Sequence, residues 1–174
     1  EYDKAALAYK NAKEWALAVD AYKKVAECHK ANGVLSASGR ALESAAGCCK
    51  DGLGDGQQCA ELYRAAAETY HLNNNDDRAA DALTRGAKAI DTLATKAADS
   101  GTADVAQALW ETAIQLVRDG INLYDDNEKL AVYGSKAVKV GIVIALRARV
   151  VVQAIALYEQ SSLINAAANR ANEV

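Results

Sequence analysis

The sequence predicts an all-α fold, a TPR-like alpha-alpha superhelix in which antiparallel helix pairs stack into a solenoid. Three observations support this prediction. Apolar residues recur every three or four positions along nearly the whole chain, which is the spacing of an amphipathic helix. Segments of helical length lie between short breaks rich in Gly, Asn and Asp. These segments also resemble one another, as the units of a repeat protein do.

The breaks divide the chain into about eight expected helices. The breaks are KANG at 30–33, DGLGDG at 51–56, LNNNDD at 72–77, ADSGTAD at 98–104 and LYDDNEK at 123–129. The expected helices span 2–13, 15–32, 36–50, 56–73, 77–95, 103–120, 127–145 and 149–171. The last boundary is the least marked, because no turn residue separates VKVGIVIALRA from RVVVQAIALYE.

Two kinds of helix alternate. In one kind an aromatic residue precedes small residues, and these aromatics are Tyr22, Tyr63, Trp110 and Tyr158. In the other kind a leucine stands between small residues, as in ASGRALESAA and RAADALTRGA. Small residues let helix backbones approach closely, and a large ring fills the space opposite them. We therefore expect the four rings to pack in the core, together with Leu42 and Leu83.

The composition of the chain excludes some classes of function. The chain has 174 residues, of which 51% are hydrophobic and 25% charged, and its net charge is −3. Its length suits a single helical-repeat domain over residues 1–174. An acidic balance argues against non-specific binding to nucleic acid, which needs a basic excess. The most apolar tract is interrupted by Lys139, Arg147 and Arg149, so no run is long enough to span a bilayer.

The cysteines and histidines do not indicate a metal site or cofactor. Cys28, Cys48, Cys49 and Cys59 show no CxxC spacing, and the two histidines stand near the ends of helical patterns. Reduced, buried thiols are the expected state. One of the adjacent pair at positions 48 and 49 is expected to face the core.

No motif predicts catalysis. The stretch DGLGDGQQ is rich in Gly but lacks the Lys and Ser or Thr of a phosphate-binding loop, so it is interpreted as a helix–helix turn. No GxSxG, HExxH or usable Cys/His spacing occurs. The apolar stretch VGIVIAL favours a buried helix, and a partner groove, a membrane-facing patch and a dimer contact stay open.

Longer stretches resemble a known family. EYDKAALAYKNAKEWALAVDAYKKVAECH, RALESAAGCCK, CAELYRAAAETYHLNNNDDRAADALTRGAKAID and AIALYEQSS are similar to the soluble NSF attachment proteins (SNAPs), most of all to the gamma type. These stretches make up 82 of the 174 residues, and 121–150 fits more loosely. The resemblance implies a twisted array of antiparallel helix pairs that forms the central part of a longer protein.

The resemblance also implies a function. Members of this family are adaptors that lie along the four-helix SNARE bundle and recruit the hexameric NSF ATPase, which disassembles the bundle. The resemblance implies a location in the cytoplasm, peripheral to membranes. Membrane contact is implied only through an N-terminal apolar loop, and ATPase activation through an acidic C-terminal tail, neither of which is recognised in this chain. The alternative is a generic TPR-like scaffold that binds a helix or peptide.

Basic residues are the candidates for partner binding, because SNARE bundles are acidic on much of their surface. The residues expected to contact the bundle are Arg40 and Arg85, with Lys50, Arg64 and Lys88 as weaker candidates. Such charges set the association rate and the orientation of partners. The alternative interpretation is that they are solvated charges on helix faces.

Overall fold

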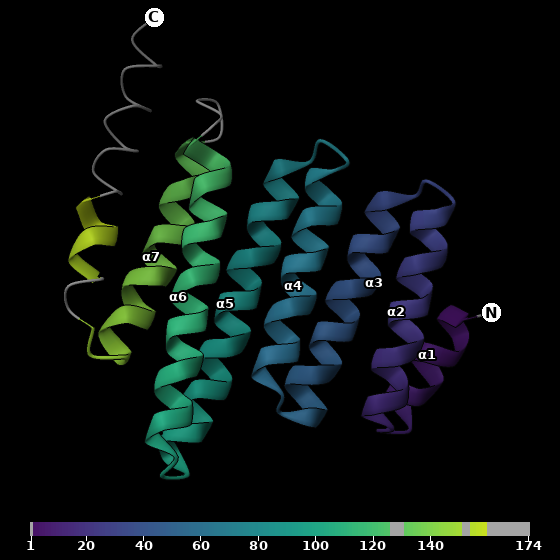
Figure 1. Ribbon diagram of the computed structural model, residues 1–174, viewed down its shortest axis with the longest axis horizontal. Coiled ribbons are helices and arrows are strands. Elements are labelled where there is room, and N and C mark those ends of the chain that lie inside the picture. The colour runs from purple at the N-terminus through teal and green to yellow at the C-terminus, as the bar shows by residue number, and fades with distance from the viewer. Residues whose placement is uncertain (1, 126–130, 151–153, 160–174) are drawn as a thin grey trace, which may run out of the picture. The chain divides into compact units, whose positions relative to one another are not determined.

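The computed structural model describes residues 2–125, 131–150 and 154–159 (Figure 1). The described residues form helices and no strand, which confirms the predicted fold class. The elements are α1 (Tyr2–Asn11), α2 (Trp15–Ala31), α3 (Leu35–Cys48), the π-helical turn η1 (Cys49–Leu53), α4 (Gly56–His71), α5 (Asp76–Asp99), α6 (Ala103–Asp125) and α7 (Ala131–Arg147). Residues 154–159 are also helical. The remainder of the helix expected at 149–171, and the start of that expected at 127–145, lie outside the described residues.

Contacts along the chain define two compact units, residues 1–82 and residues 83–174. Helix α5 begins in the first unit and continues in the second. Each unit is described by itself below. The single helical-repeat domain expected over residues 1–174 stays a prediction.

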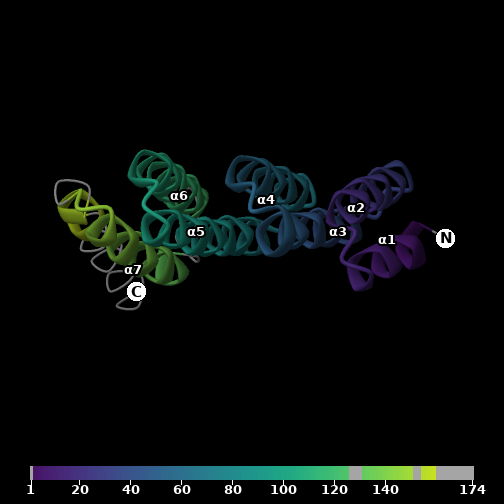
Figure 2. The same ribbon diagram turned by 90° about the horizontal axis from the view of Figure 1, so that it is seen from below.

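In the first unit, helices α2 and α4 form one layer and α3 lies in the other (Figure 2). Helix α3 packs against both α2 and α4, and α1 packs against α2. The predicted breaks form the turns. Gly33 and Asn74 adopt left-handed backbone conformations with φ of 73° and 52°, which these two residue types tolerate best. Asp55 caps α4 by accepting a hydrogen bond of 2.9 Å from the backbone N–H of Gln58.

In the second unit, α6 packs against α7. The turn before α6 contains Gly101 with φ of 83°, as the Gly-containing break predicts. The turn after α7 contains Arg149 with φ of 56°. A non-glycine residue in this region costs on the order of 1 kcal/mol. The turn thus uses an arginine where Gly or Asn is usual, which explains why the sequence marks this boundary so weakly.

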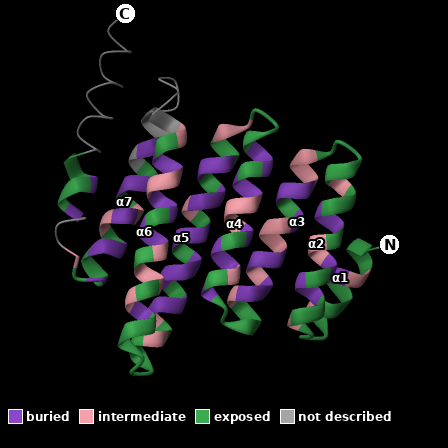
Figure 3. Cartoon of the chain, in the orientation of Figure 1, coloured by how far each residue is buried: buried purple, intermediate pink, exposed green. Residues whose placement is uncertain are grey.

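The burial pattern is that of amphipathic helices, with buried and exposed stripes along each one (Figure 3). Leu83 is buried as predicted, and Leu42 packs against a buried cluster of Val25, Ala26 and Ala41. The buried helix expected at VGIVIAL is only half correct. Ile144 is buried, whereas Val143 and Leu146 are exposed, so α7 shows one face to solvent.

The prediction for the four rings is wrong for Tyr158, whose side chain is 69% exposed. Tyr22, Tyr63 and Trp110 are only partly buried. Among the described side chains, the fully buried ring is that of Tyr70, which is 1% exposed and lies over Gly39. A Cβ atom at Gly39 would lie 2.6 Å from the Tyr70 ring, so the ring occupies the space that the glycine leaves. The predicted packing of rings on small residues therefore exists, with a different ring.

The four cysteines are free thiols. Cys48, Cys49 and Cys59 are buried as predicted, but Cys28 is exposed on α2, which corrects the prediction for that residue. Burial raises the pKa of the Cys49 thiol to about 11 and that of Cys59 to about 12, with smaller contributions from neighbouring charges. These thiols are therefore protonated at neutral pH and poor nucleophiles.

Candidate partner-binding surface

The predicted basic residues lie on several helices. Arg40 lies on α3 and is exposed, Lys50 lies in η1, and Arg64 lies on α4. Arg85 and Lys88 lie on the part of α5 that belongs to the second unit, and both are exposed. The structure therefore brings Arg85 and Lys88 together on consecutive turns of one helix.

Arg40 lines a pocket of about 190 Å³ on the first unit. Tyr22, Val25 and His29 enter this pocket from α2, and Asp3 enters from α1. Residues 37, 40, 41 and 44 line it from α3. Steps of three and four residues keep side chains on one face of a helix, so α2 and α3 each contribute one stripe. The pocket is the cleft where these two stripes meet.

The guanidinium of Arg40 makes no ion pair with any described residue, although Asp3 lines the same pocket. Ser44 donates a hydrogen bond of 3.0 Å to the carbonyl oxygen of Arg40 itself. Burial raises the pKa of the Tyr22 hydroxyl, and the nearby Cys48 and Asp3 raise it further. Tyr22 is therefore a neutral hydroxyl that can donate a hydrogen bond at physiological pH.

This arrangement can recognise a carboxylate. A guanidinium presents a planar fork of N–H donors that matches a carboxylate, and a hydroxyl nearby supplies one more donor. Asp3 lines the same pocket, so its charge opposes a free anion, and the pocket suits a carboxylate that is carried by a larger partner. An acidic side chain on the surface of a partner protein meets this condition.

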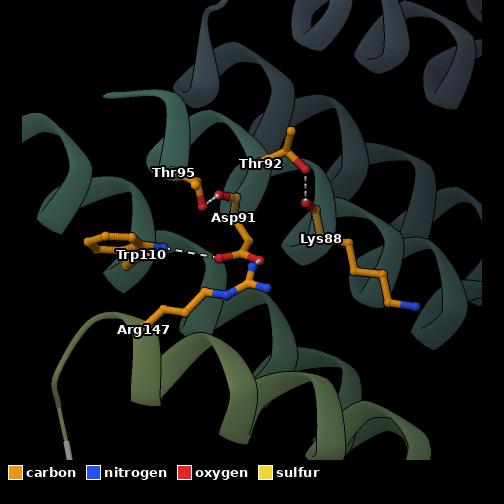
Figure 4. Close-up of polar contacts among 6 residues, drawn as sticks. All are labelled: Lys88, Asp91, Thr92, Thr95, Trp110 and Arg147. Atoms are coloured by element: carbon orange, nitrogen blue, oxygen red, sulfur yellow. Dashed lines mark hydrogen bonds and ion pairs between the residues drawn. The ribbon is translucent and has the colours of Figure 1, made fainter. Parts of the chain in front are cut away.

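The other basic candidates differ in their surroundings. The ammonium group of Lys50 forms an ion pair of 2.9 Å with Asp51, which reduces its charge toward an outside partner. Arg64 and Arg85 each interact with other groups of the chain. The ammonium group of Lys88 points away from the polar cluster around Asp91 (Figure 4). Arg40 is set in a pocket beside the polar side chains of Asp3, Tyr22 and Ser44.

Sequence reasoning missed the residues that line the pocket together with Arg40. Tyr22 was assigned to the core, and Asp3, His29 and Ser44 were not singled out. Their positions follow a helical spacing with Arg40 and Tyr22, namely 40 and 44 on α3 and 22, 25 and 29 on α2. That spacing is the signal that could have found them, once the pairing of α2 with α3 was assumed.

Sequence reasoning also missed a polar cluster in the second unit. Asp91 on α5 accepts a hydrogen bond of 3.1 Å from Nε1 of Trp110 on α6 and pairs with the guanidinium of Arg147 on α7 (Figure 4). The Asp91 side chain is largely buried, and that of Arg147 is half exposed. The cluster therefore ties three helices together and is structural, because both carboxylate oxygens already have partners.

The described residues contain no group of three or more His, Cys, Asp or Glu side chains that could hold a metal ion. Within the same residues, no helix combines the length and the apolar character that crossing a membrane requires.

Antiparallel helices stacked in alternating layers place the chain in the class of all-α helical-repeat proteins. The model of one family, "Soluble NSF attachment protein, SNAP", matches residues 1–160. The chain belongs to the soluble NSF attachment protein family, which confirms the resemblance seen in its sequence.

A relative that carries the family name supports this assignment. A gamma-soluble NSF attachment protein from Dictyostelium discoideum is 29% identical over 92 residues, which are 53% of this chain and 28% of that protein. Among solved structures, a circular tandem repeat protein with a novel repeat topology has a TM-score of 0.55 at 15% identity, over 99% of this chain and 45% of that one. This likeness shows a helical-repeat fold and nothing further. A chain described as "DHF58 filament" has a TM-score of 0.43 at 16% identity, over 99% of this chain and 76% of that one.

Proposed function

We propose that this chain is an adaptor in intracellular vesicle transport and membrane fusion. It binds the SNARE four-helix bundle and recruits an NSF-type ATPase for disassembly of that bundle. Membership of the soluble NSF attachment protein family over residues 1–160 supports this role. It acts in the cytoplasm, at the surface of membranes, and it has no enzymatic activity of its own.

The structural observation that carries the proposal is the Arg40 pocket. The guanidinium of Arg40 has no ion-pair partner among the described residues, lines a pocket together with the neutral hydroxyl of Tyr22, and belongs to an exposed residue of an acidic chain. Such a group attracts the carboxylates of a SNARE bundle and fixes the orientation of the complex. Arg85 and Lys88 supply further positive charge from α5. Arg64 and Lys50 have smaller roles, because the charge of Lys50 is already paired.

The test is binding of an assembled, immobilised SNARE bundle by the wild-type protein and by charge-reversal variants. Reversal at an exposed ion pair changes affinity by about five- to tenfold, so Arg40→Glu weakens binding by that factor. The double variant Arg40→Glu, Arg85→Glu weakens binding of the bundle further. Lys24→Glu is the matched control, because Lys24 is exposed on α2 outside the pocket.

Two outcomes would contradict the proposal. One is unchanged binding of the bundle by the double variant. The other is binding of isolated SNARE peptides with the same affinity as the assembled bundle, which would favour a generic peptide-binding scaffold.

A further inference from the structure

A second hollow lies on the first unit, between α2 and α4 and over α3. Its volume is about 310 Å³, larger than that of the Arg40 pocket. Helix α3 contributes Ser38 and Leu42 to this groove, whereas positions 37, 40, 41 and 44 line the Arg40 pocket. The two hollows therefore use different stripes of α3, and a ligand in one leaves the other accessible.

The floor of the groove is apolar. Leu42 and Leu62 line it together with Ala26 and Ala65. Its two hydroxyl groups are satisfied within the chain. Ser38 donates a hydrogen bond of 2.8 Å to the carbonyl oxygen of Ala26, and Thr69 donates one of 2.7 Å to the carbonyl oxygen of Ala65. An occupant of the floor gains contact area and no new hydrogen bonds, so it must present apolar side chains.

Leu72 extends this apolar surface beyond the floor. It lines the groove just after the end of α4, and its side chain is 61% exposed. A leucine held this far out of the core gives a binding surface one more anchor at its edge.

The wall formed by α2 carries a charge pattern. Lys23, Glu27 and Lys30 line the groove at steps of four and three residues, so they stand on successive turns of one helix face. None of the three forms an ion pair with a described residue. The opposite wall carries Glu68 from α4. The groove is therefore an apolar strip between a positive–negative–positive wall and a negative one.

We propose that this groove binds an amphipathic α-helix of a partner protein. The helix lays a stripe of Leu-sized side chains on Leu42, Leu62 and Leu72. One flank carries acidic, basic and acidic residues on successive turns, opposite Lys23, Glu27 and Lys30. A basic residue on its other flank meets Glu68.

The spacing selects a helix over an extended peptide. Lys23 and Lys30 are seven residues apart, about 10.5 Å along a helix that rises 1.5 Å per residue. A second helix lying alongside α2 repeats its side chains at the same interval, so charges on successive turns face one another. A strand rises about 3.3 Å per residue and alternates sides, and so does not reproduce steps of four and three. Helix-in-groove binding is an established mode of recognition.

The test uses two synthetic helical peptides of about 20 residues, each with the same leucine stripe. One carries a Glu–Lys–Glu flank at steps of four and three, and the other carries Lys–Glu–Lys. Fluorescence anisotropy measures the affinity of each labelled peptide for the whole chain. The wild-type protein should bind the Glu–Lys–Glu peptide at least tenfold more tightly than the other.

Protein variants make the test specific. The triple variant Lys23→Glu, Glu27→Lys, Lys30→Glu should reverse the preference between the two peptides. Glu27 and Lys30 are exposed and Lys23 is partly buried, and circular dichroism checks that the variant folds. Leu72→Asp should weaken the binding of both peptides. Lys24→Glu, on α2 but outside the groove, should leave peptide binding unchanged.

The proposal is overturned if the wild-type protein binds the two peptides equally or binds neither at 100 μM peptide, a concentration well above the micromolar affinities of such complexes. It is also overturned if the triple variant keeps the wild-type preference. Self-association of the wild-type chain that the triple variant abolishes would make a second copy the occupant, and this too would overturn it.

Discussion

The two units solve the same packing problem with different side chains. In the first unit, α3 and α4 meet through small residues, and the largest buried side chain is the ring of Tyr70 against Gly39. In the second unit, the largest fully buried side chains among the described residues are branched aliphatic ones, namely Ile90, Ile114, Leu116, Val117, Ile121, Val138, Ile144 and Leu157. That unit also contains the Asp91 cluster, which joins α5, α6 and α7.

This difference shows what a helical repeat constrains. The alternation of helices is common to both units, whereas the means of joining neighbouring helices is not. Small residues join helices by close approach, which depends on one ring filling one gap. Large aliphatic residues bury more area and tolerate a polar contact between them. Substitutions in each unit test these two means of packing separately.

The largest effect is expected from Tyr70→Ala. Removing a fully buried ring leaves a cavity over Gly39, and such substitutions cost about 3–5 kcal/mol. Chemical denaturation measures this as a fall in the free energy of unfolding. The matched control is Tyr158→Ala, which removes a ring that is 69% exposed. It should cost less than about 0.5 kcal/mol, and equal losses at the two positions would contradict the assignment of core and surface.

The next effect is expected from Asp91→Ala. It leaves the indole N–H of Trp110 without its acceptor and Arg147 without its counter-ion, at a cost of about 1–3 kcal/mol. Asp91→Asn keeps one carbonyl oxygen as acceptor and should cost less. In a Trp15→Phe background, the fluorescence of Trp110 reports on the cluster directly. If Asp91→Ala does not shift the emission of Trp110, the result argues against the hydrogen bond between Trp110 and Asp91.

A smaller effect distinguishes two glycines of α3. Gly39→Ala puts a methyl group 2.6 Å from the Tyr70 ring, and overpacking of this kind costs about 1–3 kcal/mol. Gly47→Ala meets no atom within 4 Å and should stabilise the helix by about 0.5–1 kcal/mol. Thermal unfolding of both variants gives the comparison. Stabilisation by both would show that the ring does not fill the gap over Gly39.

The smallest effect concerns the buried thiols. The pKa values of Cys49 and Cys59 are raised from 9.0 to about 11 and about 12 in the folded chain, so folding favours the protonated thiols. Their contribution to stability is complete below pH 9 and is lost as the pH rises toward 11 to 12. Urea denaturation should therefore show a lower free energy of unfolding at pH 10.5 than at pH 8. The loss should be smaller in a Cys49→Ala, Cys59→Ala variant, and an identical loss would contradict the shifts.

Helical periodicity and turn residues were enough to predict the helices up to α6. Gly33, Asn74 and Gly101 mark turns because they tolerate left-handed backbone conformations. The boundary after α7 is weak in the sequence because Arg149 takes that role. The predicted helix ends differ from the observed ones by a few residues. Helix α5, for example, ends at Asp99 and not at residue 95.

The buried ring could not be chosen from the repeat alone. Tyr63 and Tyr70 lie on the same helix seven residues apart, and both stand near small residues. Which of them is buried depends on where Gly39 of α3 faces α4, and that is a property of the tertiary packing. The Asp91 cluster was missed for the same reason, because its three members are 19 and 56 residues apart along the chain.

For the candidate site, the sequence supplied Arg40 as a charge but not its surroundings. Asp3, Tyr22 and His29 come from two other helices, and their approach to Arg40 requires α1, α2 and α3 to pack as they do. The groove between α2 and α4 was not predicted at all. Its charge pattern on α2 is readable in the sequence, but its floor is formed by α3 and α4.

The central claim is that basic side chains including Arg40 guide this chain onto an acidic SNARE bundle. Stopped-flow measurement of the association rate with the assembled bundle, at about 50 and 300 mM salt, tests it directly. We predict a wild-type rate that falls steeply with salt and a rate for Arg40→Glu with Arg85→Glu that is slower and nearly independent of it. A double variant with the wild-type rate and the same salt dependence would contradict the claim.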